Sequence, residues 1–111
     1  MLKIKDNVDL KELEKFGFKR DIQEQPTWRS KWAENKEKYV GEKYTEIGYV
    51  FDDGRNEIIV IESRINSDWH HLEQPRQLYV RESDYDMGVS MYIYDKVFDL
   101  ITAGLVEKVS D

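Results

Sequence analysis

The clearest hydrophobic–polar pattern in the chain lies over residues 44–63, YTEIGYVFDDGRNEIIVIES. Two runs rich in aromatic and β-branched residues, 44–51 and 57–63, flank the dipeptide Asp53-Gly54. Asp-Gly between two such runs is the strongest short-range signal for a β-hairpin. The pattern therefore predicts a hairpin of two antiparallel strands at the centre of the chain.

The register of this hairpin stays open in the sequence. A two-residue turn pairs Tyr49 with Ile58, whereas a three-residue turn with a bulge pairs Tyr49 with Ile59. In either register the run IIVI, residues 58–61, is apolar on both faces. Such a run is typical of a central strand rather than of a sheet edge.

A short helix is predicted near the start of the chain, over residues 9–16. Asp9 is a suitable N-cap, and the apolar residues of LKELEKF recur at every third position. Gly17 accepts the left-handed conformation that ends many helices. A strand over residues 18–21 is expected to follow.

A second helix is predicted near residues 90–103, within SMYIYDKVFDLITAGLVEKV. Its apolar residues at helical spacing are Tyr94, Val97, Phe98, Ile101 and Leu105. Gly104 marks the stop, and LVEKV is compatible with a last strand. We expect Phe98 and Ile101 to lie in the core, against the sheet. A further strand is expected at residues 77–82, in RQLYVRES.

Residues 22–43 admit two interpretations. QPTWRSKWAENKEKYVGEK fits a helix capped at Thr27 and ended by Gly41, in which Trp28 and Trp32 share one face. TWRSKW also alternates, so a strand followed by a polar loop fits equally well. Nothing in the pattern decides between them.

Together these elements predict an α+β fold in one domain, residues 1–111. A small antiparallel sheet is built around the 44–63 hairpin, with the C-terminal helix and the short N-terminal helix packed on it. The length of 111 residues and the 40% of apolar residues suffice for one core.

Composition excludes several classes of protein. Cysteine is absent, which excludes disulfides, thiol catalysis and cysteine-bound zinc. No window approaches the roughly 18 apolar residues of a membrane helix, and the charged first residues do not form a signal peptide, so we expect a cytoplasmic protein. The net charge of −6 is uneven: residues 1–50 carry +1 and residues 51–111 carry −7, which disfavours binding to nucleic acid.

Candidate chemistry gathers in SDWHHLEQPRQ, residues 67–77, where Asp68, His70, His71 and Glu73 are close together. Adjacent histidines diverge on a strand or a helix, and no further histidine completes a metal site. Pro75 opposes a regular element through the segment. We therefore expect a surface loop with accessible histidines and no cofactor or metal.

The sequence contains no catalytic constellation but is rich in Trp and Tyr, which are favoured at protein interfaces. It therefore predicts a non-enzymatic protein-interaction module that binds a partner protein or forms a homo-oligomer, with no role at a membrane. The candidate partner-binding residues are Trp69, His70, His71, Arg76, Tyr79 and Tyr85. The alternatives are a nucleic-acid-binding accessory protein, using Arg29, Lys31, Trp32, Lys36 and Lys38, and a small metal-dependent hydrolase.

The two ends of the chain, KIKDNVDLKELEKFGFK and YDKVFDLITAGLVEKV, resemble small uncharacterised proteins from phages and prophages of low-GC Gram-positive bacteria. The resemblance covers roughly a third of the chain and includes no catalytic motif. It implies a phage or prophage accessory protein, for which a modulator of a host protein is a natural role.

Overall fold

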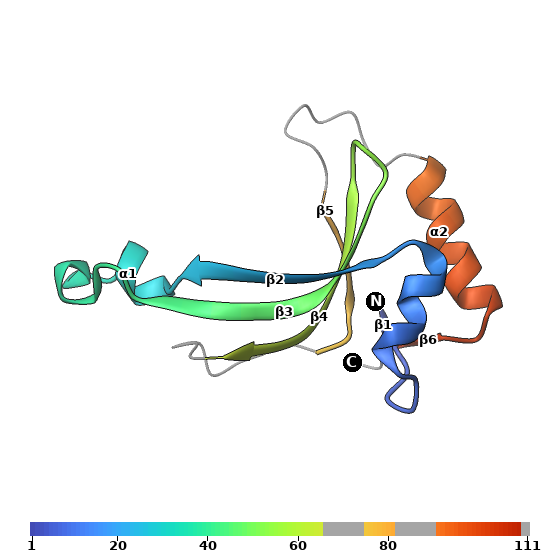
Figure 1. Ribbon diagram of the computed structural model, residues 1–111, viewed down its shortest axis with the longest axis horizontal. Helices are drawn as coiled ribbons and strands as arrows, with labels where there is room; N and C mark the ends of the chain where they lie inside the picture. Colours follow the sequence, from blue (N-terminus) through green and yellow to red (C-terminus); the bar gives the residue numbers. More distant parts are fainter. Residues whose placement is uncertain (66–74, 82–90, 110–111) are drawn as a thin grey trace.

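The computed structural model describes residues 1–65, 75–81 and 91–109 (Figure 1). The helices and strands of the described residues follow the order β1 (Leu2–Ile4), the 3-10 helix η1 (Leu10–Phe16), β2 (Lys19–Pro26), α1 (Trp28–Trp32), the 3-10 helix η2 (Lys36–Tyr39), β3 (Lys43–Asp52), β4 (Glu57–Ile65), β5 (Leu78–Arg81), α2 (Met91–Thr102) and β6 (Val106–Lys108).

The predicted α+β class is confirmed. Four antiparallel strands form one sheet in the order β2-β3-β4-β5, and β1 pairs with β6 in a separate two-stranded sheet. Strand β4 lies inside the larger sheet, as its two-sided apolar run predicts. One buried cluster joins η1, the larger sheet and α2; its members are Ile4, Leu10, Leu13, Phe18, Tyr49, Ile58, Val60, Ile93 and Leu100.

The predicted hairpin is present, but both predicted registers are wrong. Tyr49 pairs with Val60, and the last pair before the loop is Asp52 with Glu57. The side chain of Asp53 explains the longer connection, since its carboxylate accepts hydrogen bonds from the backbone of Arg55 at 2.8 Å and of Asn56 at 2.7 Å. This aspartate-stabilised turn lengthens the loop to four residues.

A bulge then shifts the pairing of β3 and β4 between Ile47 and Gly48. Gly48 pairs with Ile61 and Ile47 with Ser63, so Glu62 is the extra residue. A Cβ atom on Gly48 would lie 2.4 Å from the carbonyl oxygen of Val60. Only glycine permits this close approach of the two backbones.

The N-terminal helix is confirmed as a single 3-10 helix. The Asp9 carboxylate accepts from the Lys11 amide at 3.0 Å, and Gly17 adopts φ of 88° at the C-cap. The following strand is longer than the predicted 18–21, because β2 pairs with β3 over eight residues from Lys19 to Pro26. The pairing partner, rather than the weak local pattern, determines the length of this strand.

Helix α2 is found where predicted, but its predicted core face is wrong. Phe98 is 67% exposed and Ile101 is also largely exposed, whereas Leu100 and Ile93 are buried. Phe98 and Leu100 are two positions apart, which places them on opposite sides of a helix. The helix has apolar residues on both sides, and the sheet covers only one of them.

For residues 22–43, the predicted helix is correct in its cap at Thr27 but wrong in its end at Gly41, and the strand alternative is wrong for residues 28–32. Strand β2 ends at Pro26, Thr27 caps the five-residue helix α1, and the extended backbone of Ala33 ends it. The short helix η2 follows, and Gly41 turns back into β3 with φ of 83°. The segment is therefore a turn of two short helices between two long strands.

The outer halves of β2 and β3 project from the remainder of the molecule as an arm, residues 22–47, at the left of Figure 1. Residues 27–42, at its end, are called the arm tip, and the described residues outside the arm are called the body. The molecule measures 48 × 35 × 27 Å, and its Cα radius of gyration is 15.6 Å. A compact chain of this length has a radius of gyration of about 13 Å. The larger value agrees with an arm that projects from the molecule.

Candidate interaction site at the arm tip

Thr27 holds the arm tip together. Its hydroxyl accepts from the Ser30 amide at 3.3 Å, and the Ser30 hydroxyl donates to the Thr27 carbonyl at 2.8 Å. Its own amide donates to the carbonyl of Glu42 at 3.2 Å, which joins the two ends of the tip. The Thr27 side chain is fully buried by these contacts. The tip therefore has a defined local structure although it lies far from the core.

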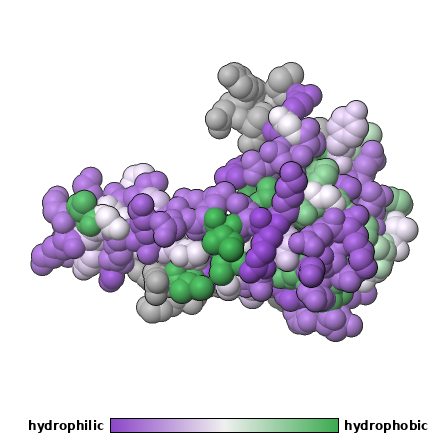
Figure 2. All heavy atoms as spheres, viewed as in Figure 1, coloured by the Kyte–Doolittle hydropathy of each residue, from purple (hydrophilic) through white to green (hydrophobic). Residues whose placement is uncertain are grey.

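Large apolar side chains are exposed on this tip. Trp28 and Trp32 are four positions apart on α1, so they share one side of the helix, and Trp32 is 68% exposed. Val40, after η2, is also exposed. Figure 2 shows hydrophobic side chains on the arm surrounded by hydrophilic ones. Tryptophan is strongly enriched at interface hot spots, so two exposed tryptophans on one side of a helix indicate a binding surface.

Two cations of the arm tip lie over aromatic rings. Arg29 forms an ion pair with Glu42 at 2.7 Å and lies over the ring of Tyr39, 4.4 Å from its centroid. The Lys31 ammonium lies 5.6 Å from the Trp32 ring centroid. These contacts hold aromatic and cationic groups side by side on the surface.

The arm tip and the rest of the chain differ in net charge. The tip holds four cations and three carboxylates, which gives it a net charge of +1. Since the net charge of the whole chain is −6, the remainder of the chain has a net charge of −7. Lys36 and Lys38 are exposed and have no ion-pair partner among the described residues. The tip is thus the more cationic end of an acidic molecule.

An exposed apolar row joins the arm tip to the body. Ile22 pairs with Ile47 across β2 and β3, and Ile47 is two positions from the buried Tyr49 on the same side of the sheet. Ile65 of β4 pairs with Thr45 of β3, which is two positions from Ile47 and therefore on the same side of the sheet. Ile22 is 59% exposed and Ile65 is also exposed. The core face of the sheet therefore continues into the arm without a cover.

A second apolar surface lies on α2 at the opposite end of the molecule (Figure 1). Four exposed side chains three or four positions apart form the α2 stripe: Met91, Tyr94, Phe98 and Ile101. Asp95 and Asp99 lie beside it, and neither has an ion-pair partner among the described residues. The stripe is an apolar surface with an acidic border.

Of the six predicted partner-binding residues, four lie outside the described residues: Trp69, His70, His71 and Tyr85. The predicted surface loop over residues 67–77 lies outside them as well, apart from its last three residues. Tyr79 is in β5, half-buried, and its hydroxyl donates to the Gln77 side chain at 3.3 Å. The structure does not bring Tyr79 close to the arm tip, which lies at the far end of the molecule (Figure 1).

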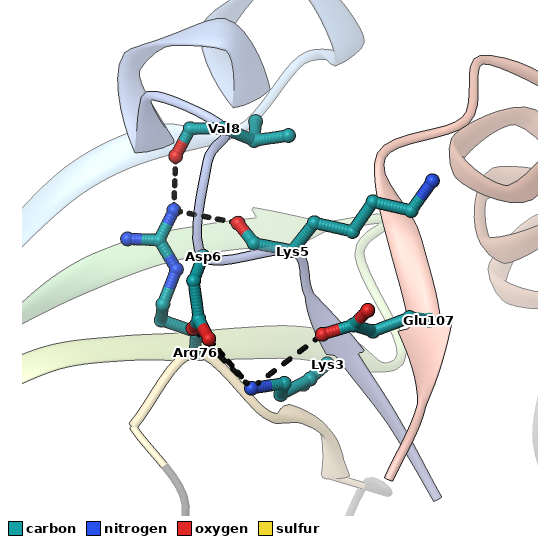
Figure 3. Close-up of polar contacts among 6 residues, drawn as sticks. All are labelled: Lys3, Lys5, Asp6, Val8, Arg76 and Glu107. Carbon is teal, nitrogen blue, oxygen red and sulfur yellow. Dashed lines mark hydrogen bonds and ion pairs between the residues drawn. The ribbon is translucent and has the colours of Figure 1, made fainter.

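Arg76 connects the start of β5 to the N-terminal segment (Figure 3). Its guanidinium donates to the carbonyl of Lys5 at 3.0 Å and to the carbonyl of Val8. Its backbone carbonyl accepts from the Ile4 amide at 2.8 Å. Arg76 adopts φ of 76°, a left-handed conformation that is uncommon outside glycine. These contacts give Arg76 a structural role, and its predicted role in binding stays a prediction.

Beside Arg76, Lys3 of β1 lies between two carboxylates (Figure 3). Its ammonium is 3.2 Å from Asp6 and 3.5 Å from Glu107 of β6. The cluster joins the two ends of the chain through β1 and β6. Its charges stabilise the small sheet and do not suggest catalysis.

The open side of the larger sheet contains a shallow depression of about 460 Å³. It is lined by Gly17, Lys19, Arg20, Asp21, Gln23, Val50, Asp52, Glu57 and Arg81. Arg81 donates to Glu57 at 2.6 Å, and this hydrogen bond raises the pKa of the guanidinium above its ordinary value. Asp52 accepts from the Gly54 amide at 2.7 Å. Asp21 accepts from the Gln23 side chain at 2.7 Å, so most of the polar groups described there already have a partner within the protein.

Within the described residues, no group of three or more acidic or histidine side chains is placed to hold a metal ion. None of the described helices has the length and apolar character required to cross a membrane. No family model, curated protein or solved structure matches this chain. The case for function therefore depends on the exposed surfaces themselves.

Sequence reasoning named part of the arm tip, although for a different purpose. The residues assigned to the nucleic-acid alternative, Arg29, Lys31, Trp32, Lys36 and Lys38, all lie in the tip. Trp28 and Val40 were missed as binding residues, as was the α2 stripe. The four-residue spacing of the two tryptophans is the signal that points to a shared surface.

Proposed function

We propose that this protein is a non-enzymatic protein-interaction module of phage or prophage origin, acting in the cytoplasm, and that the arm tip is its binding element. One observation carries the proposal: Trp28 and Trp32 are exposed side by side at the end of a projecting arm. The lack of cysteine is consistent with a reducing compartment. The resemblance of the chain ends to phage proteins supports the proposed origin.

The shape of the arm lets the tip reach a partner surface at a distance from the body. Paired strands hold the tip away from the body, and the caps at Thr27 keep α1 formed before binding. A binding element that is already ordered loses less conformational entropy when it binds. The cations of the arm tip favour a partner surface with an acidic border.

The test is affinity capture from a lysate of a low-GC Gram-positive bacterium, followed by titration of the captured protein in purified form. Trp28→Ala/Trp32→Ala is compared with Tyr92→Ala, a matched aromatic truncation at an exposed position of α2 outside the stripe. Loss of one hot-spot tryptophan costs about 2 kcal/mol or more, which is about 30-fold in affinity, so we expect the double variant to bind at least about 30-fold and up to about 1,000-fold more weakly. Equal binding by both variants would contradict the proposal.

Nucleic-acid binding is the second candidate, and the gathering of Lys36, Lys38 and Trp32 in one tip favours it. Stacking of bases on an aromatic ring beside lysines is a common way to bind single strands. A titration of single-stranded oligonucleotides at about 50 and 200 mM salt separates the candidates. Tight binding that weakens with salt and is lost in Lys36→Glu/Lys38→Glu would replace the first proposal by this one.

A further inference from the structure

The exposed surfaces of the molecule allow the class of partner that binds the arm tip to be specified. This inference rests on the proposed function of the tip. Two exposed apolar surfaces of the described residues lie at the ends of the molecule, namely the arm tip and the α2 stripe. They lie at opposite ends of the longest axis, which measures 48 Å (Figure 1). One copy of the chain therefore cannot bring its own tip to its own α2.

The α2 stripe has the geometry of a helix-packing surface. Its side chains are separated by three, four and three positions, the spacing at which one helix packs along another. The opposite side of α2 already packs on the core through Ile93 and Leu100. The stripe is therefore available to a helix that lies outside this copy of the chain.

Helix α1 has the complementary features. Trp28 and Trp32 form an apolar pair on one side of it, and Lys36 and Lys38 follow within the same tip. The stripe is bordered by acidic side chains, whereas the tip has a positive net charge within an acidic protein. Apolar contact and opposite charge thus favour the same pairing.

We propose that the arm tip packs on the α2 stripe of a second copy of this chain, in a two-fold dimer in which each copy contributes one arm. Two molecules that lie side by side in opposite directions place each tip at the α2 end of the other. The two contacts are identical, so the assembly closes and leaves neither surface exposed. Ile22 of the arm and Ile65, which pairs with Thr45 of the arm, are also exposed and would approach the partner's body.

The size of the contact agrees with a stable dimer. Exposed aromatic and aliphatic side chains of this kind supply roughly 400 Å² on each surface, so two tip–stripe contacts bury about 1,600 Å² in total. That area is the size of a standard specific interface. A pairing of the two α2 helices alone would bury only about half as much.

The experiment measures the mass of the full chain by light scattering and sedimentation from about 1 to 200 μM. We expect the wild-type protein to be a dimer at the upper end of this range. Lys36→Glu/Lys38→Glu changes the tip, and Asp95→Lys/Asp99→Lys changes the border of the stripe; all four positions are exposed. Each variant alone brings like charges together in both contacts, and we expect its dimerisation to weaken at least tenfold.

Mixing the two variants is the decisive measurement. In the mixed dimer, the glutamates of one tip meet the lysines of the other stripe, and the unchanged lysine tip meets the unchanged acidic stripe. We therefore expect the mixture to dimerise with an affinity within a few-fold of wild type. Unchanged unfolding midpoints of both variants establish that each is folded.

Several results would overturn the inference. A wild-type protein that is monomeric at 200 μM has no such contact. A dimer that survives the tip variant is joined through α2 or the body, and one that survives the stripe variant is joined through the arms. A mixture that stays monomeric excludes the tip–stripe pairing. If a monomeric protein still loses its captured partner in Trp28→Ala/Trp32→Ala, the inference fails while the proposed function holds.

Discussion

The arm and the body share one face of one sheet, but they differ in what covers it. Tyr49 of β3 is 3% exposed beneath the helices. Ile47 is the next residue of β3 on the same side of the sheet, and its partner in β2, Ile22, is 59% exposed. Both positions are apolar and both lie in regular paired strands. The difference follows from the short reach of η1 and α2, which cover the body end of the sheet only (Figure 1).

The comparison separates folding from binding. In the body, apolar side chains are removed from water and stabilise the fold; in the arm, they stay in water and are available to a partner. The arm is stabilised by the pairing of β2 with β3, by the cap at Thr27 and by ion pairs such as Arg29 with Glu42, rather than by a buried core. We therefore expect substitutions in the two regions to act on different measurements.

The largest effect is expected for Leu100→Ala, which removes a fully buried side chain from the core. Loss of the buried methyl groups and the cavity left behind should lower the free energy of unfolding by about 2–5 kcal/mol. Phe98→Ala, two positions away on the exposed side, should change it by no more than about 0.5 kcal/mol. Urea unfolding of both variants measures the difference, at a protein concentration of about 1 μM, below the range in which we expect the dimer. Equal losses would show that α2 packs in a different rotation.

Arg76→Met should have the next largest effect. It removes the donors to the Lys5 and Val8 carbonyls but keeps much of the apolar stem. Hydrogen bonds from a charged group contribute about 1.5–3 kcal/mol, and we expect a loss of unfolding free energy in that range. Arg55→Met, in the exposed hairpin loop, is the matched control. A neutral result would mean that water replaces the guanidinium at both carbonyls.

Thr27→Ala should act on the arm alone. Removing the N-cap costs the helix about 0.5–2 kcal/mol, so the Ser30 amide should exchange its hydrogen roughly 2- to 30-fold faster. The urea midpoint of the whole protein should stay unchanged, since the tip contributes nothing to the core. Hydrogen exchange and urea unfolding of the same samples provide the comparison. A lower urea midpoint would show that arm and body unfold as one unit.

The smallest effect is expected from removal of the arm tip. Replacing residues 27–42 by Asn-Gly keeps the pairing of β2 with β3 and supplies a suitable hairpin turn. The free energy of unfolding should change by less than about 1 kcal/mol, since the shorter loop offsets the lost contacts. Loss of folding would contradict the division into arm and body.

The sequence predicted those elements whose signals are local. Asp9 and Gly17 delimit the first helix, Thr27 caps α1, and Asp53-Gly54 lies in the loop between β3 and β4. Each of these signals acts through a backbone hydrogen bond or a backbone conformation within a few residues. Such interactions form in the same way whatever the rest of the chain does.

The candidate site was predicted only in part, since exposure is not a local property. The four-residue spacing of Trp28 and Trp32 indicates a shared side, but that side could equally have packed on the sheet. Only the position of α1 at the end of an arm leaves both rings in water. The cations of the tip were visible in the sequence, while their separation from the acidic body was not.

The sequence by itself determined the class of the fold, the position of the hairpin, the caps, and the extent of the last helix. The tertiary structure alone decided the pairing of β1 with β6, the length of β2 and the buried side of α2. These features depend on contacts between segments far apart in the chain. Where α2 has apolar residues on two sides, only the helix and sheet that pack against it determine which side is buried.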